Sequence, residues 1–340
     1  FVVMSLASIG LKEHPVARRG IQFLKHSMRE DGSWPIDTNL ATWVTTLAIN
    51  SRMGFQPVHG RWLLDQQYKT EHPYTHSAPG GWAWTDLSGG VPDADDTSGA
   101  LLALKKLAPE DEQVRRAAEA GVRWLVELQN RDGGFPTFCR GWGALPFDKS
   151  CTDLTGHALR AISAWSDTHD DVIQRGLAYL RNQQRADGSW IPLWFGNQHT
   201  HDQENPVLGT SRVLMALSAL KQGGVDIDSA MMERAVAWLV STQAEDGGWG
   251  GGRDAPPSVE ETALAVDALA RCMEQVDIDP GVLIRGVNRL LTEIESSPEF
   301  VPQPIGLYFA RLWYYEDLYP LVFTRSALAE ATDLSTIFST

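Results

Sequence analysis

Apolar residues recur at the spacing of an amphipathic helix in short segments spread along the whole chain. Within each segment they fall at positions i, i+3, i+4 and i+7, which places them on one face of a helix. The segments are clear at residues 20–24, 121–125, 176–180 and 235–239 and weaker at 60–63 and 286–290. Six copies predict a repeat architecture in which each copy forms an outer helix.

A turn follows most of these segments. Gln129 to Phe135, Gln184 to Trp190 and Gln243 to Trp249 each combine Asp-Gly or Gly-Gly with a final aromatic residue, and Asp31 to Trp34 is a shorter copy. Glycine ends a helix because it accepts positive φ. The residues beyond the turns are rich in Ala, Leu, Val and Thr and predict buried inner helices at 38–50, 94–107, 153–165, 205–221 and 258–271.

Six outer and six inner helices predict an all-α fold, an (α/α)6 barrel of six helical hairpins. We expect a single domain over residues 1–340. The turns at 68–92 and 136–152 are longer than the others, and long loops on one rim of a barrel are where sites are usually built.

Composition excludes several classes of function. A formal net charge of -14 argues against broad binding of nucleic acid, which needs a positive surface. No apolar run is long enough to span a bilayer. Cys139, Cys151 and Cys272 are odd in number and form no Cys-x-x-Cys pair, so we expect core thiols in a reducing, cytoplasmic compartment. The 13 tryptophans must fill a core or line a pocket.

Three acids, Asp93, Asp95 and Asp96, stand together at the start of one expected inner helix. Helix capping would explain one of them. Three carboxylates in four positions repel one another, so an enclosed site should raise the pKa of at least one acid well above its normal value. A neutral carboxylic acid held away from water is what protonation of an alkene requires.

The Asp-x-Asp-Asp-Thr motif at 93–97, with the Gln-x-x-x-Gly-x-Trp type turns, resembles the squalene-hopene and oxidosqualene cyclase superfamily of class II terpene cyclases. Residues 80–84 match a Gly-Gly-Phe-Ala-Phe stretch of hopene cyclases, and residues 153–157 match their Asp-Val-Thr-Ala-His segment. The resemblance implies that Asp95 is the proton donor and that His157 hydrogen-bonds it. Asp37 and Asp153 would support this pair.

The resemblance also implies a lining of aromatic side chains, because π faces stabilise a carbocation without offering it lone pairs. The candidates are Trp84, Trp194, Phe195, Tyr308, Phe309, Trp313 and Tyr314, the last four preceding a turn at Tyr319-Pro320. Some of these rings will serve only to pack the core.

This chain departs from the family in two respects. Ile36 stands where hopene cyclases carry a tryptophan, so one end of the cavity should differ in shape. Hopene cyclases also have two barrels, and this chain has residues for one. It therefore resembles either a piece of a larger cyclase or, as we prefer, a monodomain cyclase of the merosterolic acid synthase type, which acts on a prenylated aromatic acid. Arg140, Lys149 or Arg212 could bind an acidic head group.

Two other classes of protein compete with this interpretation. A protein prenyltransferase β-subunit shares the barrel but needs zinc, and the chain has no Asp-x-Cys pair for it. A non-catalytic barrel would use the acids only as helix caps. His199, His201, Asp202 and Glu204 could suggest a metal cluster, but no cysteine or third histidine lies in register with them, and we expect a polar loop.

The implied ligand is an amphiphilic isoprenoid, whose uptake would involve peripheral contact with a membrane. No nucleic acid is expected, and the oligomeric state stays open. A protonation cascade needs no metal or redox cofactor, and Mg²⁺ would be required only if the substrate carried a diphosphate.

Overall fold

The computed structural model describes residues 2–30, 32–34, 39–138, 146–296, 299–308 and 311–338. Six residues singled out from the sequence lie outside these ranges: Asp31, Ile36, Asp37, Cys139, Arg140 and Phe309. The chain divides into two compact units, Phe1–Leu40 and Ala41–Thr340. A single domain over the whole chain stays a prediction.

The first unit contains α1 (Val2–Ser8) and α2 (Pro15–Ser27). Pro15 begins α2, where its missing N–H costs nothing, and the His14 side chain accepts a hydrogen bond from the N–H of Val16. The expected outer segment at 20–24 lies within α2 as predicted, although Ile21, Phe23 and Leu24 are exposed within this unit.

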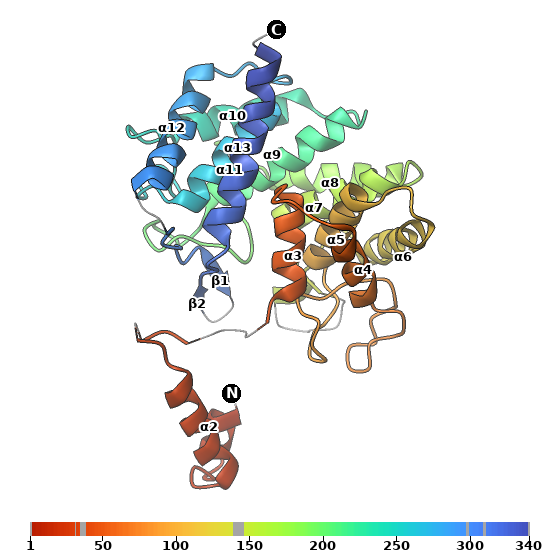
Figure 1. Cartoon of the computed structure of the whole chain (residues 1–340), viewed down its shortest axis with the longest axis vertical. Coiled ribbons are helices and arrows are strands. Elements are labelled where there is room, and N and C mark those ends of the chain that lie inside the picture. Colours follow the sequence, from red (N-terminus) through yellow and green to blue (C-terminus); the bar gives the residue numbers. More distant parts are fainter. Residues whose placement is uncertain are drawn as a thin grey trace. The chain divides into compact units, whose positions relative to one another are not determined.

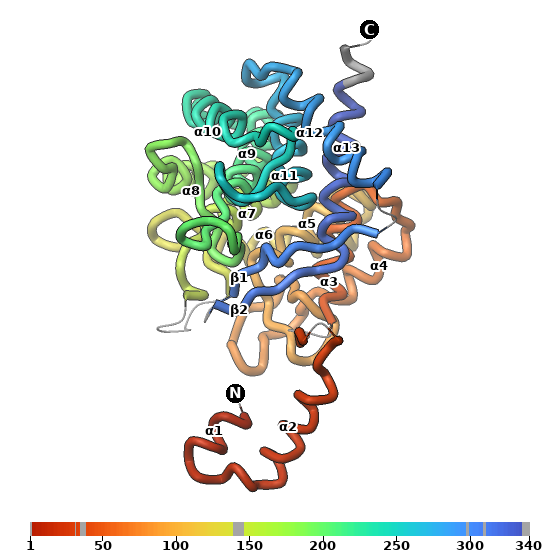
Figure 2. Tube along the Cα trace, turned by 90° about the vertical axis from the view of Figure 1, so that its left-hand side faces the viewer, coloured from red at the N-terminus to blue at the C-terminus, as the bar shows by residue number. Residues whose placement is uncertain are grey.

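Six helices form an inner ring in the described part of the second unit (Figures 1 and 2). They are α3 (Ala41–Asn50), α5 (Ala94–Leu107), α7 (Thr152–Trp165), α9 (Pro206–Gln222), α11 (Val259–Cys272) and α13 (Tyr319–Phe338). Each packs on the next, and α13 returns to α3, so the ring closes. Leucine and alanine side chains fill the core between these helices, as in α9, where Leu208, Leu214 and Leu217 are inaccessible to solvent.

Outer helices alternate with the inner ones along the chain. They are α4 (Pro57–Gln66), α6 (Glu112–Leu128), α8 (Asp170–Gln183), α10 (Ser229–Ser241) and α12 (Pro280–Ser296). Each is apolar on one side only; in α6 the buried residues include Val114, Val122 and Leu125. The observed helices confirm the predicted all-α barrel. None of those described is long and apolar enough to cross a membrane.

Smaller elements lie in the connections. A 3-10 turn, η1, spans Pro146–Asp148, and an antiparallel pair of strands, β1 (Gly306–Tyr308) and β2 (Leu312–Tyr314), precedes α13. The predicted turn at Tyr319-Pro320 is wrong, because these residues begin α13. Proline fits there because the first residues of a helix need no intrahelical N–H donor. The sixth inner helix was therefore not located from sequence.

In three of the turns a glutamine ties one hairpin to the next. The side-chain amide of Gln129 donates to Gly133 O at 2.8 Å and to Val172 O, at the start of the following outer helix, at 2.9 Å. Arg175 in turn donates to Gln129 Oε1. Gln184 and Gln243 repeat the arrangement.

The turn glycine permits this close approach. Gly133 has a φ of +90°, and a Cβ added there would lie 2.3 Å from Arg175 O. Gly188 has the same conformation and a similar constraint from Arg234 O. Glycine is therefore required by both the backbone angle and the neighbouring helix. The sequence identified these turns but not the hydrogen bonds of their glutamines.

Candidate active site

The acids of the 93–97 motif stand at the start of α5. Asp93 is the N-cap, and its carboxylate accepts a hydrogen bond from the backbone N–H of Asp96 at 2.8 Å. The N–H of Asp93 donates to Trp82 O, which fixes the entry of the helix. Capping therefore accounts for Asp93, while Asp95 and Asp96 lie in the first turn.

Asp95 contacts α7. Its Oδ1 lies 2.6 Å from Nδ1 of His157, so the hydrogen bond expected between them is present. The Asp95 and His157 side chains remain 23% and 15% exposed, whereas Asp93 and Asp96 are each 3% exposed. Of the three acids, Asp95 is the one most accessible to a ligand.

Burial favours the protonated form of the other two acids. It raises the pKa of Asp93 to about 7. Burial and the neighbouring Asp93 raise the pKa of Asp96 well above its ordinary value. Among the described residues, Asp96 Oδ1 is also buried without a hydrogen-bond partner. The raised pKa expected within the cluster thus falls on this pair.

Asp153 lies one turn before His157 on α7 and is buried. It accepts a hydrogen bond from the Cys151 thiol at 2.5 Å, and the N–H of Leu193 donates to the Cys151 sulfur at 3.2 Å. Burial raises the pKa of Asp153, and the charge of Asp95 adds to that shift. The charge of Asp95 therefore acts on Asp153, but the hydrogen bond described for the Asp153 carboxylate comes from the Cys151 thiol. The sequence predicts Cys151 only as a core thiol and does not reveal its contact with Asp153.

Aromatic rings form a continuous row in the loops that precede the inner helices. Trp84 lies 6.0 Å from Phe138 between ring centres, and Phe138 lies 4.9 Å from Phe147. Phe147 is 5.4 Å from Trp194, which is 4.8 Å from Tyr308. Trp84, Trp194 and Tyr308, which are three of the predicted lining residues, are therefore brought together.

The row ends beside the acids. Burial and the charge of Asp93 raise the pKa of Tyr308 to about 12. Phe195 is buried and forms a β-bridge with Gly306, which docks β1 on this loop. Trp313 lies on the paired strand β2.

Phe138 and Phe147 were missed from sequence. Both lie in the long turn at 136–152, where no periodic pattern marks which aromatic side chains are buried. The one feature of the sequence that could have indicated Phe138 and Phe147 is that they are aromatic residues in a long insertion.

A cavity of about 90 Å³ lies between the inner helices and reaches His157 and Asp153. Trp43 and Phe323 contribute apolar walls. Arg212, one of the predicted head-group residues, lines this cavity, whereas Lys149 is exposed elsewhere.

The residues considered for a metal site make other contacts. Glu204 pairs with Arg185 at 2.7 Å, and Nδ1 of His201 lies 2.9 Å from the carboxylate of its neighbour Asp202. Within the described ranges, no three His, Cys, Asp or Glu side chains are grouped as a metal site would require.

Comparison with known proteins identifies the family. The squalene-hopene cyclase C-terminal domain family matches residues 37–270, and the chain belongs to this family. A probable squalene-hopene cyclase from Sinorhizobium fredii is 30% identical over 85% of this chain and 49% of its own length. A drimenyl diphosphate synthase from Streptomyces showdoensis is 30% identical over 78% of this chain and 47% of its own length. The chain thus spans about half the length of these relatives.

Solved structures share the fold. The type II terpene cyclase MstE from Scytonema superposes with a TM-score of 0.61 at 17% identity, over 92% of this chain and 96% of its own. A variant of it is described in complex with geranylgeranyl dihydroxybenzoate as substrate. The ent-copalyl diphosphate synthase from Streptomyces platensis has a TM-score of 0.63 at 22% identity, over 92% of this chain and 55% of its own.

Proposed function

We propose that this chain is a class II terpene cyclase in which Asp95 protonates an alkene of a polyprenyl substrate. The observation that carries the proposal is the contact of 2.6 Å between Asp95 and His157, in a cluster where Asp95 alone is substantially accessible. Family membership supplies independent support.

The initial step moves one proton. The Asp95 carboxylic acid gives its proton to an alkene carbon, the π bond breaks, and a tertiary carbocation forms on the adjacent carbon. Because His157 contacts Oδ1, the transferred proton is assigned to Oδ2. An N–H on Nδ1 of His157 would then stabilise the carboxylate that remains.

Ring closure follows without further reagents. The π electrons of the next alkene attack the cation and form a carbon–carbon σ bond, and a final deprotonation returns the proton, so the product is an isomer of the substrate. The row from Trp84 to Tyr308 presents π faces that stabilise the migrating charge. Asp93, Asp96 and His157 act by positioning and stabilising Asp95.

The substrate class we favour is a prenylated aromatic acid. Its support is the single barrel of this chain and its likeness, across nearly the full length, to a monodomain cyclase described with such a substrate. Arg212, which lines the cavity at His157, is the described candidate for contact with an acidic group.

A second candidate follows from the half-length match to squalene-hopene cyclases. The chain could represent the barrel of a longer cyclase that acts on a hydrocarbon. Turnover of a prenylated aromatic acid by this chain alone would support the first candidate. Turnover of squalene only after addition of a second barrel domain would support this one.

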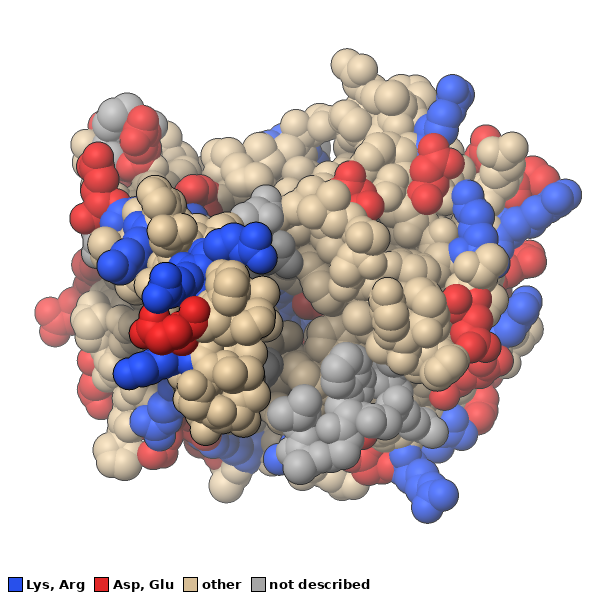
Figure 3. Space-filling model, turned by 90° about the horizontal axis from the view of Figure 1, so that it is seen from below, with Lys and Arg blue, Asp and Glu red and all other residues tan. Residues whose placement is uncertain are grey.

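The ligand is proposed to reach the enzyme from a membrane surface. In Figure 3, residues other than Lys, Arg, Asp and Glu occupy much of the centre and right of the view, whereas Lys and Arg side chains gather in a cluster at the left and acidic and basic side chains mix at the right-hand edge. An amphiphilic substrate could transfer from lipid at such a surface. Sedimentation with lipid vesicles would test this contact.

The direct test of the proposed function is incubation with a panel of polyprenyl substrates, followed by mass spectrometry. We expect a product of unchanged mass and altered retention from at least one amphiphilic substrate. Absence of any isomeric product across hydrocarbons, diphosphates and prenylated acids, with folded protein, would favour a binding module.

A further inference from the structure

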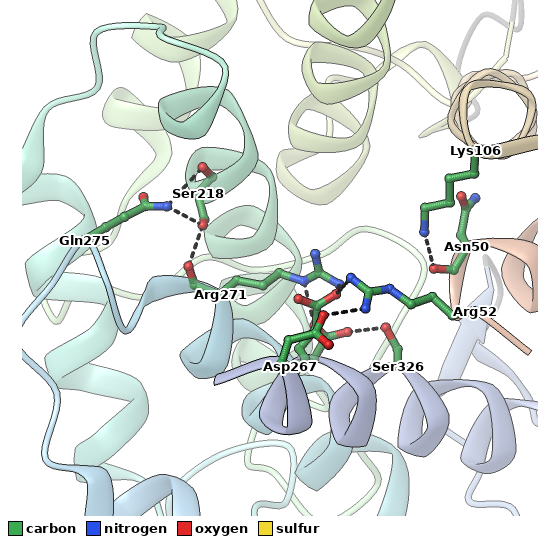
Figure 4. A network of polar contacts seen from close by, with 10 residues as sticks. Asn50, Arg52, Lys106, Ser218, Asp267, Arg271, Gln275 and Ser326 are labelled. Carbon is green, nitrogen blue, oxygen red and sulfur yellow. Dashed lines mark hydrogen bonds and ion pairs between the residues drawn. The ribbon is translucent and has the colours of Figure 1, made fainter. Parts of the chain in front are cut away.

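The cavity between the inner helices has a strongly basic end. The cavity is lined there by Asn50, Arg160, Arg212, Asp267, Arg271 and Ser326, and we call this part the basic chamber. Lys106 contacts Asn50, one of these lining residues: its ammonium group donates to the backbone carbonyl oxygen of Asn50 at 2.5 Å (Figure 4).

The three acidic side chains near the basic chamber, Asp267, Glu330 and Asp333, all form ion pairs with Arg271 or Arg52. Arg271 pairs with Asp267 at 2.6 Å and with Glu330 at 2.7 Å. Arg52 pairs with Asp333 at 2.5 Å and also with Glu330, at 3.1 Å. Figure 4 shows Arg52, Asp267 and Arg271 in this network.

The remaining cations lack such partners. In the part of the chain that the structure describes, Arg160 has no ion pair or hydrogen bond, and Lys106 bonds only a backbone carbonyl. Arg212 lies over the Phe323 ring, 5.5 Å from its centre. Asp153, at the other end of the cavity, is already bonded to the Cys151 thiol. Asp267 and Glu330 attract Arg160, and Glu330 attracts Lys106, but both acids are ion-paired with Arg271, and no described carboxylate forms an ion pair with Arg160 or Lys106.

The pKa values of these groups are lowered for the same reason. Burial and the charges of Arg160, Arg271 and Arg52 lower the pKa of Lys106 to about 8. Burial and Arg271 lower the pKa of Arg160 to about 10. An anion between Arg160 and Lys106 would relieve this repulsion.

The size of the cavity limits which anion can bind. At about 90 Å³ it is much smaller than the roughly 300–1,000 Å³ of pockets that hold drug-sized ligands, so its basic end suits a compact anion. A tetrahedral oxyanion is compact, and a guanidinium presents a planar pair of donors that matches it.

We propose that the basic chamber binds one small inorganic oxyanion of the phosphate class, held by Arg160 and Lys106. This site lies one helical turn beyond His157 on α7 and goes beyond the proposed cyclase activity, on which it does not depend.

The test is isothermal titration of the full chain with inorganic phosphate at pH 7, with ionic strength held constant by sodium chloride. We expect saturable binding at one site and a matching rise in melting temperature. Arg160→Gln should weaken binding at least tenfold. It should fold normally, because no described hydrogen bond of Arg160 is lost, and its melting temperature without phosphate should equal or exceed that of the wild type.

Arg181→Gln is the matched control, since Arg181 is exposed on α8 and pairs loosely with Asp228 at 3.4 Å. It should bind phosphate like the wild type. Lys106→Gln is a second variant and should also weaken binding. Sulfate should compete with phosphate, and chloride should not.

Three results would overturn the proposal. They are the absence of saturable phosphate binding by the wild type, equal affinity in the Arg160→Gln and Arg181→Gln variants, and displacement of phosphate by chloride as effective as that by sulfate.

Discussion

Asp95 and Asp96 are adjacent in sequence but differ in what surrounds them. Asp95 retains access and a basic neighbour, whereas Asp96 is enclosed and holds a proton through burial. We therefore expect Asp95→Asn to reduce turnover by roughly 1,000-fold or more, because an amide cannot deliver an acidic proton. Product formation by mass spectrometry measures the loss, and circular dichroism checks the fold. Wild-type turnover in this variant would leave the motif as a helix cap.

His157 supports the acid without being the proton source. We expect His157→Phe to slow turnover by roughly 10–100-fold, less than Asp95→Asn, because the Asp95 proton remains while a hydrogen bond to its carboxylate is lost. Rates from the two variants under identical conditions give the comparison. A greater loss in His157→Phe than in Asp95→Asn would reverse the assigned roles.

Sequence reasoning at the scale of residues succeeded where a motif fixed the position. Asp95 and His157 were paired from the 93–97 and 153–157 segments, and they are in contact. The sequence predicted that one clustered acid would keep its proton but could not say which, because burial depends on the loops packed over α5. The Cys151–Asp153 contact was missed for the same reason.

The helical hairpins depend on their turn glutamines. Gln129 is buried and bonds two carbonyl oxygens and Arg175, so Gln129→Ala leaves several polar groups without partners. We expect it to lower the free energy of unfolding by about 2–3 kcal/mol. Gln183→Ala, at an exposed position in α8, is the control and should change it by less than about 0.5 kcal/mol. Urea unfolding measures both, and equal values would show that the turn bonds contribute little.

α11 begins with a buried acid, Glu260, whose Oε2 has no hydrogen-bond partner among the described residues. Burial raises its pKa to about 7 from 4.5. The folded state thus holds a proton that the unfolded state releases, and stability should fall as pH rises from about 5 to about 8. Glu260→Gln should flatten this fall by up to about 3 kcal/mol. Thermal unfolding between pH 5 and pH 8 measures it, and an unchanged slope would contradict the assignment.

At the scale of elements the sequence was most informative where the repeat was regular. Inner helices α5, α7, α9 and α11 follow predicted segments closely. The sequence does not predict α13, because no Asp-Gly-aromatic turn precedes this helix. The strands β1 and β2 occupy that connection instead. A repeat recognised by its Asp-Gly-aromatic turns cannot locate a helix that is preceded by a pair of strands.

For the molecule as a whole, the proposed cyclisation requires a proton donor but neither a metal ion nor a redox cofactor. We expect turnover of a prenylated acid to be unchanged by a chelator, because forming σ bonds from π bonds supplies the driving force. Assays with and without chelator, followed by addition of Zn²⁺ or Mg²⁺, provide the measurement. Loss of activity restored only by Zn²⁺ would favour prenyltransferase chemistry, and restoration by Mg²⁺ would indicate a diphosphate substrate.

The barrel closes where α13 meets α3. Trp43 Nε1 donates to the Tyr319 hydroxyl at 3.0 Å across 276 positions of sequence, and Arg52, two residues beyond the end of α3, donates to Glu330 on α13. Every other joint of the ring connects two inner helices that have only one outer helix between them along the chain. Closing this joint carries the largest loss of chain entropy, so it should form last during folding and open first under stress. A chain shortened before Tyr319 would remain an open arc, with the helix that completes the wall around His157 missing.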